Sequence, residues 1–137
     1  MNNRIIFVTI VTLLVLSCIA AYAEDAGFTP YASDVISGAS VTIGNDGSTI
    51  TATASVSART MSDQVGISTL KFQKYNNGTW ITVKTVRSVY KYDAIVYRGS
   101  HTYTGESGEK YRVVCTFYVS DNGISDTLSK TSSTVTL

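Results

Sequence analysis

Cysteine, proline and histidine are scarce in this chain of 137 residues, which contains two Cys, one Pro and one His. Two cysteines cannot build a disulfide scaffold or a four-cysteine zinc site, and a single histidine excludes most metal centres and acid–base arrangements. The chain also lacks an excess of charge of either sign, because it has 11 Lys and Arg and 10 Asp and Glu. We therefore expect no cofactor, no metal and no nucleic-acid partner, since nucleic-acid binding depends on a basic patch.

The first 23 residues have the three-part pattern of a secretory signal peptide. A polar, weakly basic start at Asn2–Arg4 precedes the apolar run Ile5–Leu16, and Ala21-Tyr22-Ala23 supplies a small-x-small cleavage site. The apolar run is shorter than the roughly 20 residues that span a bilayer, so we expect secretion with no membrane span after cleavage. Val15-Leu16-Ser17-Cys18 also resembles a bacterial lipobox, and a lipid anchor through Cys18 is the alternative.

Cleavage after Ala23 would leave 114 residues with 10 basic and 10 acidic side chains. Cys18 would leave with the signal peptide, so Cys115 would have no intramolecular partner and no disulfide could stabilise the fold. Residues 24–34, which include the only proline, are expected to form a flexible leader. Residues 35–137 are then one domain, which must be stabilised by its hydrophobic core.

The composition after residue 23 is typical of β-strands. It includes 12 Val, 7 Ile and 17 Thr but only three Leu and three Glu. In Ser48–Ala58 and in Tyr111–Ser120, apolar and polar residues alternate with a period of two. This alternation places one face of each strand in a core and the other in water, as is typical of antiparallel sheets.

Three Asx-Gly turns indicate how the strands are joined, because Asn-Gly and Asp-Gly favour the type I′ hairpin turn. They occur in Asn45-Asp46-Gly47, Asn76-Asn77-Gly78 and Asp121-Asn122-Gly123. The predicted hairpins are Val35–Gly44 with Ser48–Ala58, Ser68–Tyr75 with Thr79–Val86, and Tyr111–Ser120 with Ile124–Thr134.

Val96–Thr104 is a further strand between the second and third hairpins, and Met61–Gly66 and Ser88–Asp93 are predicted to be connections without helix. Seven short strands with this turn spacing predict an all-β domain, a single antiparallel β-sandwich.

The order of hairpins resembles the fibronectin type III arrangement of the immunoglobulin-like sandwich. Gly108-Glu109-Lys110-Tyr111, followed by Val113, Cys115, Asp121-Asn122-Gly123 and Ser125, is similar to the tyrosine-corner strand of that fold. The resemblance implies that the Tyr111 hydroxyl bonds to the backbone near Gly105 or Ser107. The chain departs from the pattern in one respect, because its only tryptophan, Trp80, opens the fourth predicted strand.

About the last 80 residues also resemble a family of small, uncharacterised secreted proteins of Gram-positive gut bacteria. The shared segments are Met61–Gly66, Gly78-Thr79-Trp80, Ser100–Gly105 and Tyr111–Thr136. The resemblance implies export and a β-sandwich. It transfers no catalytic residue, because no activity is established for the family.

His101 and Cys115 are the only nucleophile–base candidates. Cys115 shares the apolar face of its strand with Val113 and Phe117, and His101 shares a face with Tyr97. Burial would raise the pKa of the thiol, so we interpret Cys115 as a core residue and expect no enzyme activity. Six of the ten acidic residues occupy the leader, turns and the loop before Tyr111, and they form no recognisable catalytic pair.

The tyrosines are the most suggestive candidates for function. Tyr90, Tyr92 and Tyr97 cluster in the sequence around charged residues, and exposed tyrosines offer a rigid apolar surface with a polar end. These three are the candidate ligand-binding residues, with a glycan or a surface protein as partner. The function predicted is that of a secreted, non-catalytic binding or adhesion module. The alternatives are a small secreted carbohydrate-active hydrolase and a self-associating surface protein that pairs through the weakly charged strand Thr79–Val86.

Overall fold

The structure, a computed structural model, describes residues 33–137, so the predicted signal peptide, Cys18 and the leader up to residue 32 lie outside the described residues. The described part is all-β and contains no helix, which confirms the predicted class. Its strands are β1 (Ile36–Asp46), β2 (Thr49–Asn76), β3 (Thr79–Thr104), β4 (Lys110–Asp121), β5 (Ile124–Thr131) and the short β6 (Val135–Thr136). All of the pairings between them are antiparallel.

Strands β2 and β3 are far longer than predicted, because each joins two of the predicted strands. The predicted connections Met61–Gly66 and Ser88–Asp93 are wrong, since they lie inside β2 and β3. The backbone is nevertheless irregular there: the ladder between β2 and β3 shifts register between Ser57 and Ser62, and Ser88 and Asp93 both have positive φ. Bulges of this kind bend a strand and increase its twist without ending it.

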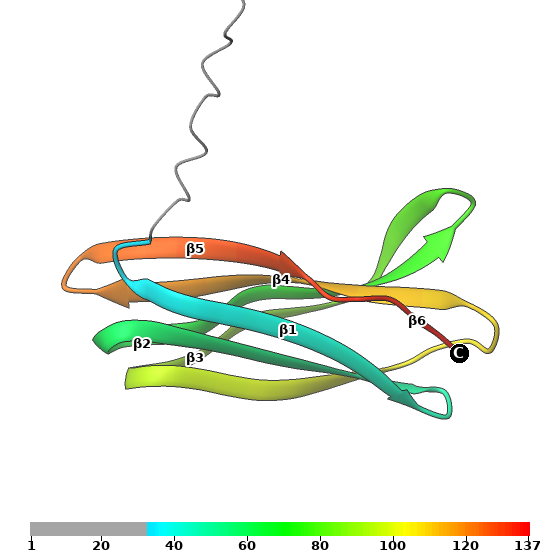
Figure 1. Cartoon of the computed structure of the whole chain (residues 1–137), viewed down its shortest axis with the longest axis horizontal. Helices are drawn as coiled ribbons and strands as arrows, with labels where there is room; N and C mark the ends of the chain where they lie inside the picture. The colour runs from blue at the N-terminus through cyan, green and yellow to red at the C-terminus, as the bar shows by residue number, and fades with distance from the viewer. Residues whose placement is uncertain (1–32) are drawn as a thin grey trace, which may run out of the picture. The chain divides into compact units, whose positions relative to one another are not determined.

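The two long strands carry the rest of the sheet. The first half of β2 pairs with β1 and with the end of β3, whereas the second half pairs with the start of β3 and with β4. Strands β5 and β6 both add to β4. The sheet curls so that β1 (cyan) comes close to β4 and β5 (orange) although no ladder joins them (Figure 1).

All three predicted hairpins form, although the first turn differs from the prediction. Asn77-Gly78 and Asn122-Gly123 have positive φ at both positions, as the predicted type I′ turn requires. In the first hairpin Asp46 still pairs with Thr49, and only Gly47 has positive φ. This is the glycine-first pattern of a type II′ turn, so type I′ is wrong there.

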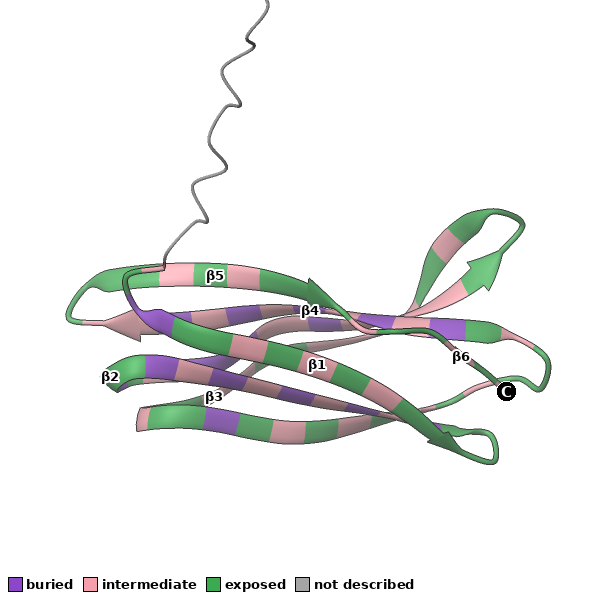
Figure 2. Ribbon diagram, viewed as in Figure 1, coloured by how far each residue is buried: buried purple, intermediate pink, exposed green. Residues whose placement is uncertain are grey.

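One hydrophobic cluster fills the inside of the curl, and the burial colours alternate along β2 and β4 as the period of two predicts (Figure 2). Its fully buried members come from both halves of β2 and from β4, among them Ile50, Val56, Ile67, Leu70, Phe72, Tyr111, Val113, Cys115, Phe117 and Val119. The inside of the curl is thus apolar, and the outward side chains are the ones available to a partner.

The predicted hydroxyl contact of Tyr111 is present. The Tyr111 ring is completely buried, and its hydroxyl oxygen accepts a hydrogen bond of 2.9 Å from the backbone N–H of Glu106. Glu106 lies between Gly105 and Ser107, the two residues near which the contact was expected. This bond fixes the loop between β3 and β4 against the start of β4.

Candidate functional site

The three candidate tyrosines do not form one surface. Tyr90 and Tyr92 lie opposite Gly66 and Gln64 of β2 and point to the outside of the sheet, and Tyr92 is 69% exposed. Tyr97, which is only 5% exposed, lies beyond the bend of β3 and belongs to the core. Its ring is therefore not available to a ligand, because Tyr97 lies opposite the core residue Val56 on the inward side of the sheet, an odd number of residues from Tyr90 and Tyr92.

Another tyrosine takes the place of Tyr97 beside Tyr90. Tyr118 of β4 and Tyr90 of β3 lie on either side of Gly66, and their ring centroids are 5.8 Å apart in an edge-to-face arrangement. A side chain at position 66 would collide with the backbone of Val89 and Tyr90. Gly66 therefore allows β3 and the Tyr90 ring to approach closely, and the two half-buried rings form one aromatic pair with Tyr92 next to it.

A second aromatic group lies at the other end of the same face, next to the β2–β3 turn. Tyr75 and Trp80 pair across the hairpin, with ring centroids 5.1 Å apart. The guanidinium carbon of Arg112 lies 4.3 Å from the centre of the Trp80 ring, and the Arg112 Nε donates a 2.8 Å hydrogen bond to Gln73 Oε1. The ammonium group of Lys110 lies 5.7 Å from the Tyr75 ring.

The register shows that both groups belong to a single outward face made by the second half of β2, the first part of β3, β4 and β5. We call it the aromatic–basic face. Its aromatic side chains are Tyr75, Trp80, Tyr90, Tyr92 and Tyr118, and its basic side chains are Lys71, Arg87, Lys110 and Arg112. The other outward positions of these strands hold Ser, Thr, Gln, Val and Gly, and within the described chain none of these ladder positions holds Asp or Glu.

Only part of this face is visible in the sequence. The period of two places Tyr75 and Tyr118 on the outward side of their strands. Arg112 and Gln73 carry no local signal, because their partners Trp80 and Thr82 belong to other strands. Only the pairing register between β2, β3 and β4 brings these side chains together.

The predicted place of Cys115 in the core is confirmed: it is a free, completely buried cysteine, and burial raises the pKa of its thiol to about 12. His101 is half-buried, and its Nε2 lies 3.3 Å from the Tyr97 hydroxyl. Burial and the nearby positive charge of Lys84 both lower the pKa of His101. These surroundings suit a packed interior and not an activated nucleophile, which needs an accessible thiol of low pKa.

Two carboxylates do come together, at the loop before β4. Glu106 and Glu109 place carboxylate oxygens 2.7 and 3.3 Å from the ammonium nitrogen of Lys74. The side chain of Glu106 is 72% exposed, so the group is a surface salt bridge and not a pair of carboxylates flanking a cleft. Among residues 33–137 no group of three or more His, Cys, Asp or Glu side chains is placed to hold a metal ion.

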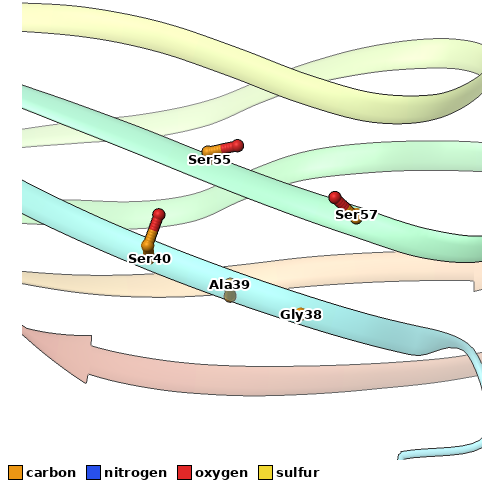
Figure 3. A pocket seen from close by; sticks show the side chains of 5 residues that line it. All are labelled: Gly38, Ala39, Ser40, Ser55 and Ser57. Carbon is orange, nitrogen blue, oxygen red and sulfur yellow. The ribbon is translucent and has the colours of Figure 1, made fainter.

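A shallow depression on the outward side of β1 and β2 has little chemical capacity. It is lined by Gly38, Ala39, Ser40, Ser55 and Ser57, and Figure 3 shows short hydroxyl side chains at its rim. A serine nucleophile needs an adjacent base, and none of these lining residues can act as one.

The outer edge of β3 pairs with no other strand of the described chain, which agrees with the prediction that Thr79–Val86 is an edge. Lys84 sits on this edge and donates a 2.6 Å hydrogen bond to the carbonyl oxygen of Thr102, near the other end of β3. It thus links the two halves of the bent strand at the open side of the curl. An inward-pointing charge on an edge strand also opposes pairing with another chain.

Comparisons of the chain with protein-family models, with curated proteins and with solved structures give no match. Within residues 33–137, no helix has the length and apolar character needed to cross a membrane.

Proposed function

We propose that the protein is an exported, non-catalytic binding or adhesion module with an immunoglobulin-like sandwich of the fibronectin type III arrangement. The pairing order supports the fold: β1, the first half of β2 and the end of β3 form a group of three, and the start of β3, the second half of β2, β4 and β5 form a group of four. The buried Tyr111 with its backbone bond supports it further, because this contact is typical of the tyrosine corner.

The aromatic–basic face is the single observation that carries the binding function. Half-buried and exposed aromatic side chains on a sheet are rigid and lose little conformational entropy on binding, so they suit recognition of a glycan or a protein surface. Tyr90 and Tyr92 are the predicted ligand-binding residues that remain on this face, and Tyr118 joins them.

The binding function is tested by capture on immobilised bacterial envelope fractions and on a panel of host-surface glycans. We expect the Tyr90→Ala/Tyr92→Ala variant to lose most of the captured signal, because two stacking surfaces are removed. The matched control is Thr51→Ala/Thr102→Ala, which changes two outward positions on the β1 side of the sheet. Equal capture of the two variants would contradict the proposal. Failure of the wild-type protein to be captured on any of these surfaces would contradict it as well.

Export rests on the pattern of residues 1–23 and is tested by the N-terminus of the secreted protein. Mass spectrometry of the protein recovered from the culture medium should find Glu24 as its first residue. An acylated Cys18 at the N-terminus, lost in a Cys18→Ala variant, would establish the lipid-anchored alternative instead.

Self-association through β3 is the second candidate function, and the unpaired edge of that strand is the observation in its favour. The exposed side chains of Ile81, Ile95 and Val96 lie along this strand. Light scattering at increasing protein concentration separates the two proposals, because growth in mass that is blocked by Ile81→Lys would indicate edge pairing.

A further inference from the structure

We infer that the aromatic–basic face binds an anionic polysaccharide, one whose sugar rings carry carboxylate or sulfate groups. The inference rests on the proposed binding function and adds the class of the ligand. Three features of the face carry it: its charge, the fixed position of Arg112, and the spacing of its rings along the strands.

The charge of the face differs from that of the whole chain. The chain has a formal net charge of +1, yet this face has four basic side chains and no acidic one on its ladder positions. Glu106 and Glu109, in the loop before β4, are already engaged by Lys74. Lys71 and Arg87 form no ion pair with any residue of 33–137, so their charges are available to an anionic partner.

Arg112 is held in a fixed orientation for an anion. Its guanidinium group lies over the Trp80 ring, and its Nε is bound to Gln73, whose amide nitrogen lies 3.4 Å from Thr82 Oγ1. The two terminal nitrogens of the guanidinium form no hydrogen bond to the described chain. A guanidinium group oriented in this way can donate two parallel hydrogen bonds to one carboxylate or sulfate, at low entropic cost.

The rings are spaced for an extended polymer. Trp80 and Tyr92 are twelve residues apart on β3, which corresponds to about 40 Å along an antiparallel strand. This length exceeds that of a single sugar ring. One aromatic group lies at each end of this stretch, and Arg87 and Lys71 lie between the two groups. An anionic polysaccharide offers ring faces for stacking and repeated negative groups for the cations, so its chemistry fits both features.

The experiment measures binding of the mature chain to four soluble polymers: polygalacturonate for carboxylates, dextran sulfate for sulfates, neutral dextran, and single-stranded DNA. We expect binding to one or both of the charged polysaccharides that weakens with added salt. Arg112→Gln should weaken that binding by about tenfold or more, because charge-assisted hydrogen bonds are lost. Arg112→Lys should recover only part of it, since lysine keeps the charge but not the planar donor pair.

Arg98→Gln is the matched control, because Arg98 is an exposed arginine that lies opposite Ser55 on the other half of the sheet. It removes the same charge from the chain and should leave binding within about twofold of the wild type, since screened charges far from the ligand contribute little. Thermal unfolding of each variant checks that the fold is retained.

Equal loss in Arg98→Gln and Arg112→Gln would overturn the inference, because net charge would then explain binding. Tighter binding of single-stranded DNA than of either charged polysaccharide would overturn it as well. If neutral dextran or another uncharged glycan binds and Tyr90→Ala/Tyr92→Ala abolishes this, the inference fails while the proposed function stands. If none of these polymers binds and envelope capture also fails, both fail.

Discussion

At the scale of single residues, the face of the strand on which a tyrosine lies decides what it does. Tyr90 and Tyr97 lie seven residues apart on β3, but one is stacked on the outside next to Tyr118 and the other is buried beside His101. Seven residues is an odd interval, so the period of two places the two rings on opposite faces of the strand, even though the ladder shifts register between them. The predicted binding role of Tyr97 is replaced by a packing role for this physical reason.

Removal of the Tyr111 hydroxyl should lower the free energy of unfolding by about 1 kcal/mol, because the backbone N–H of Glu106 would lose its acceptor. The measurement is urea unfolding of Tyr111→Phe. Tyr103→Phe is the control, since the Tyr103 ring contacts Tyr111 but no hydrogen bond holds its hydroxyl within the described chain. A change of more than about 0.5 kcal/mol in the control, or none in Tyr111→Phe, would contradict the assigned role.

His101 should make the stability of the domain depend on pH. Burial and Lys84 lower its pKa in the folded state below 6.5, so the unfolded chain binds a proton at a higher pH than the folded chain does. The free energy of unfolding is therefore not reduced by His101 above pH 6.5, and it decreases as the pH falls from 6.5 through the folded-state pKa of His101. The difference in urea midpoint between wild type and His101→Gln, measured from pH 8 to pH 5, should therefore vary below pH 6.5 and be constant above it.

At the scale of the strands, the sequence predicts the hairpins better than the bends. The Asx-Gly pairs determine two turns locally, because only small or Asx residues tolerate positive φ at both central positions. The segments Met61–Gly66 and Ser88–Asp93 contain Ser, Asp and Gly and are typical of loops. They pair with partners distant in sequence instead, and no local pattern carries that information.

Gly66→Ala should destabilise the domain by about 1–3 kcal/mol, because the new methyl group would meet the backbone of Val89 and Tyr90 where β3 crosses it. Gly44→Ala is the matched control: it also lies in a strand, and an added methyl group there would meet no atom within 4 Å. Guanidinium unfolding of both variants measures the difference. Similar midpoints for the two would show that β3 has room to move away from Gly66.

At the scale of the whole domain, residues 33–137, one apolar cluster stabilises the fold, and no disulfide joins any of the described residues. The cluster includes residues from both halves of the long strands and from β1 and β4, so we expect the two halves to unfold together. The aromatic–basic face needs β2, β3 and β4 to pair in the observed register, because its members come from all three strands.

A chain of residues 24–137 should therefore unfold at the same temperature with and without a reducing agent. In the native protein at pH 8, Cys115 should resist a thiol-specific reagent for hours, because it is buried and its pKa is about 12. The same reagent should label it within minutes in concentrated urea. Rapid labelling of the native protein would contradict the buried position of Cys115 and reopen the enzymatic alternative.

The sequence by itself determined the all-β class, the two Asn-Gly turns and the buried place of Cys115, since strand alternation and turn conformation depend on neighbouring residues. The Tyr111 contact was implied by the resemblance to the tyrosine-corner strand. Only the tertiary structure decided that β2 and β3 continue through their bends, and that Arg112 meets Trp80. These outcomes depend on ladder register between strands far apart in the chain. A register is set by how the whole sheet buries its apolar face, so it cannot be derived from any one segment.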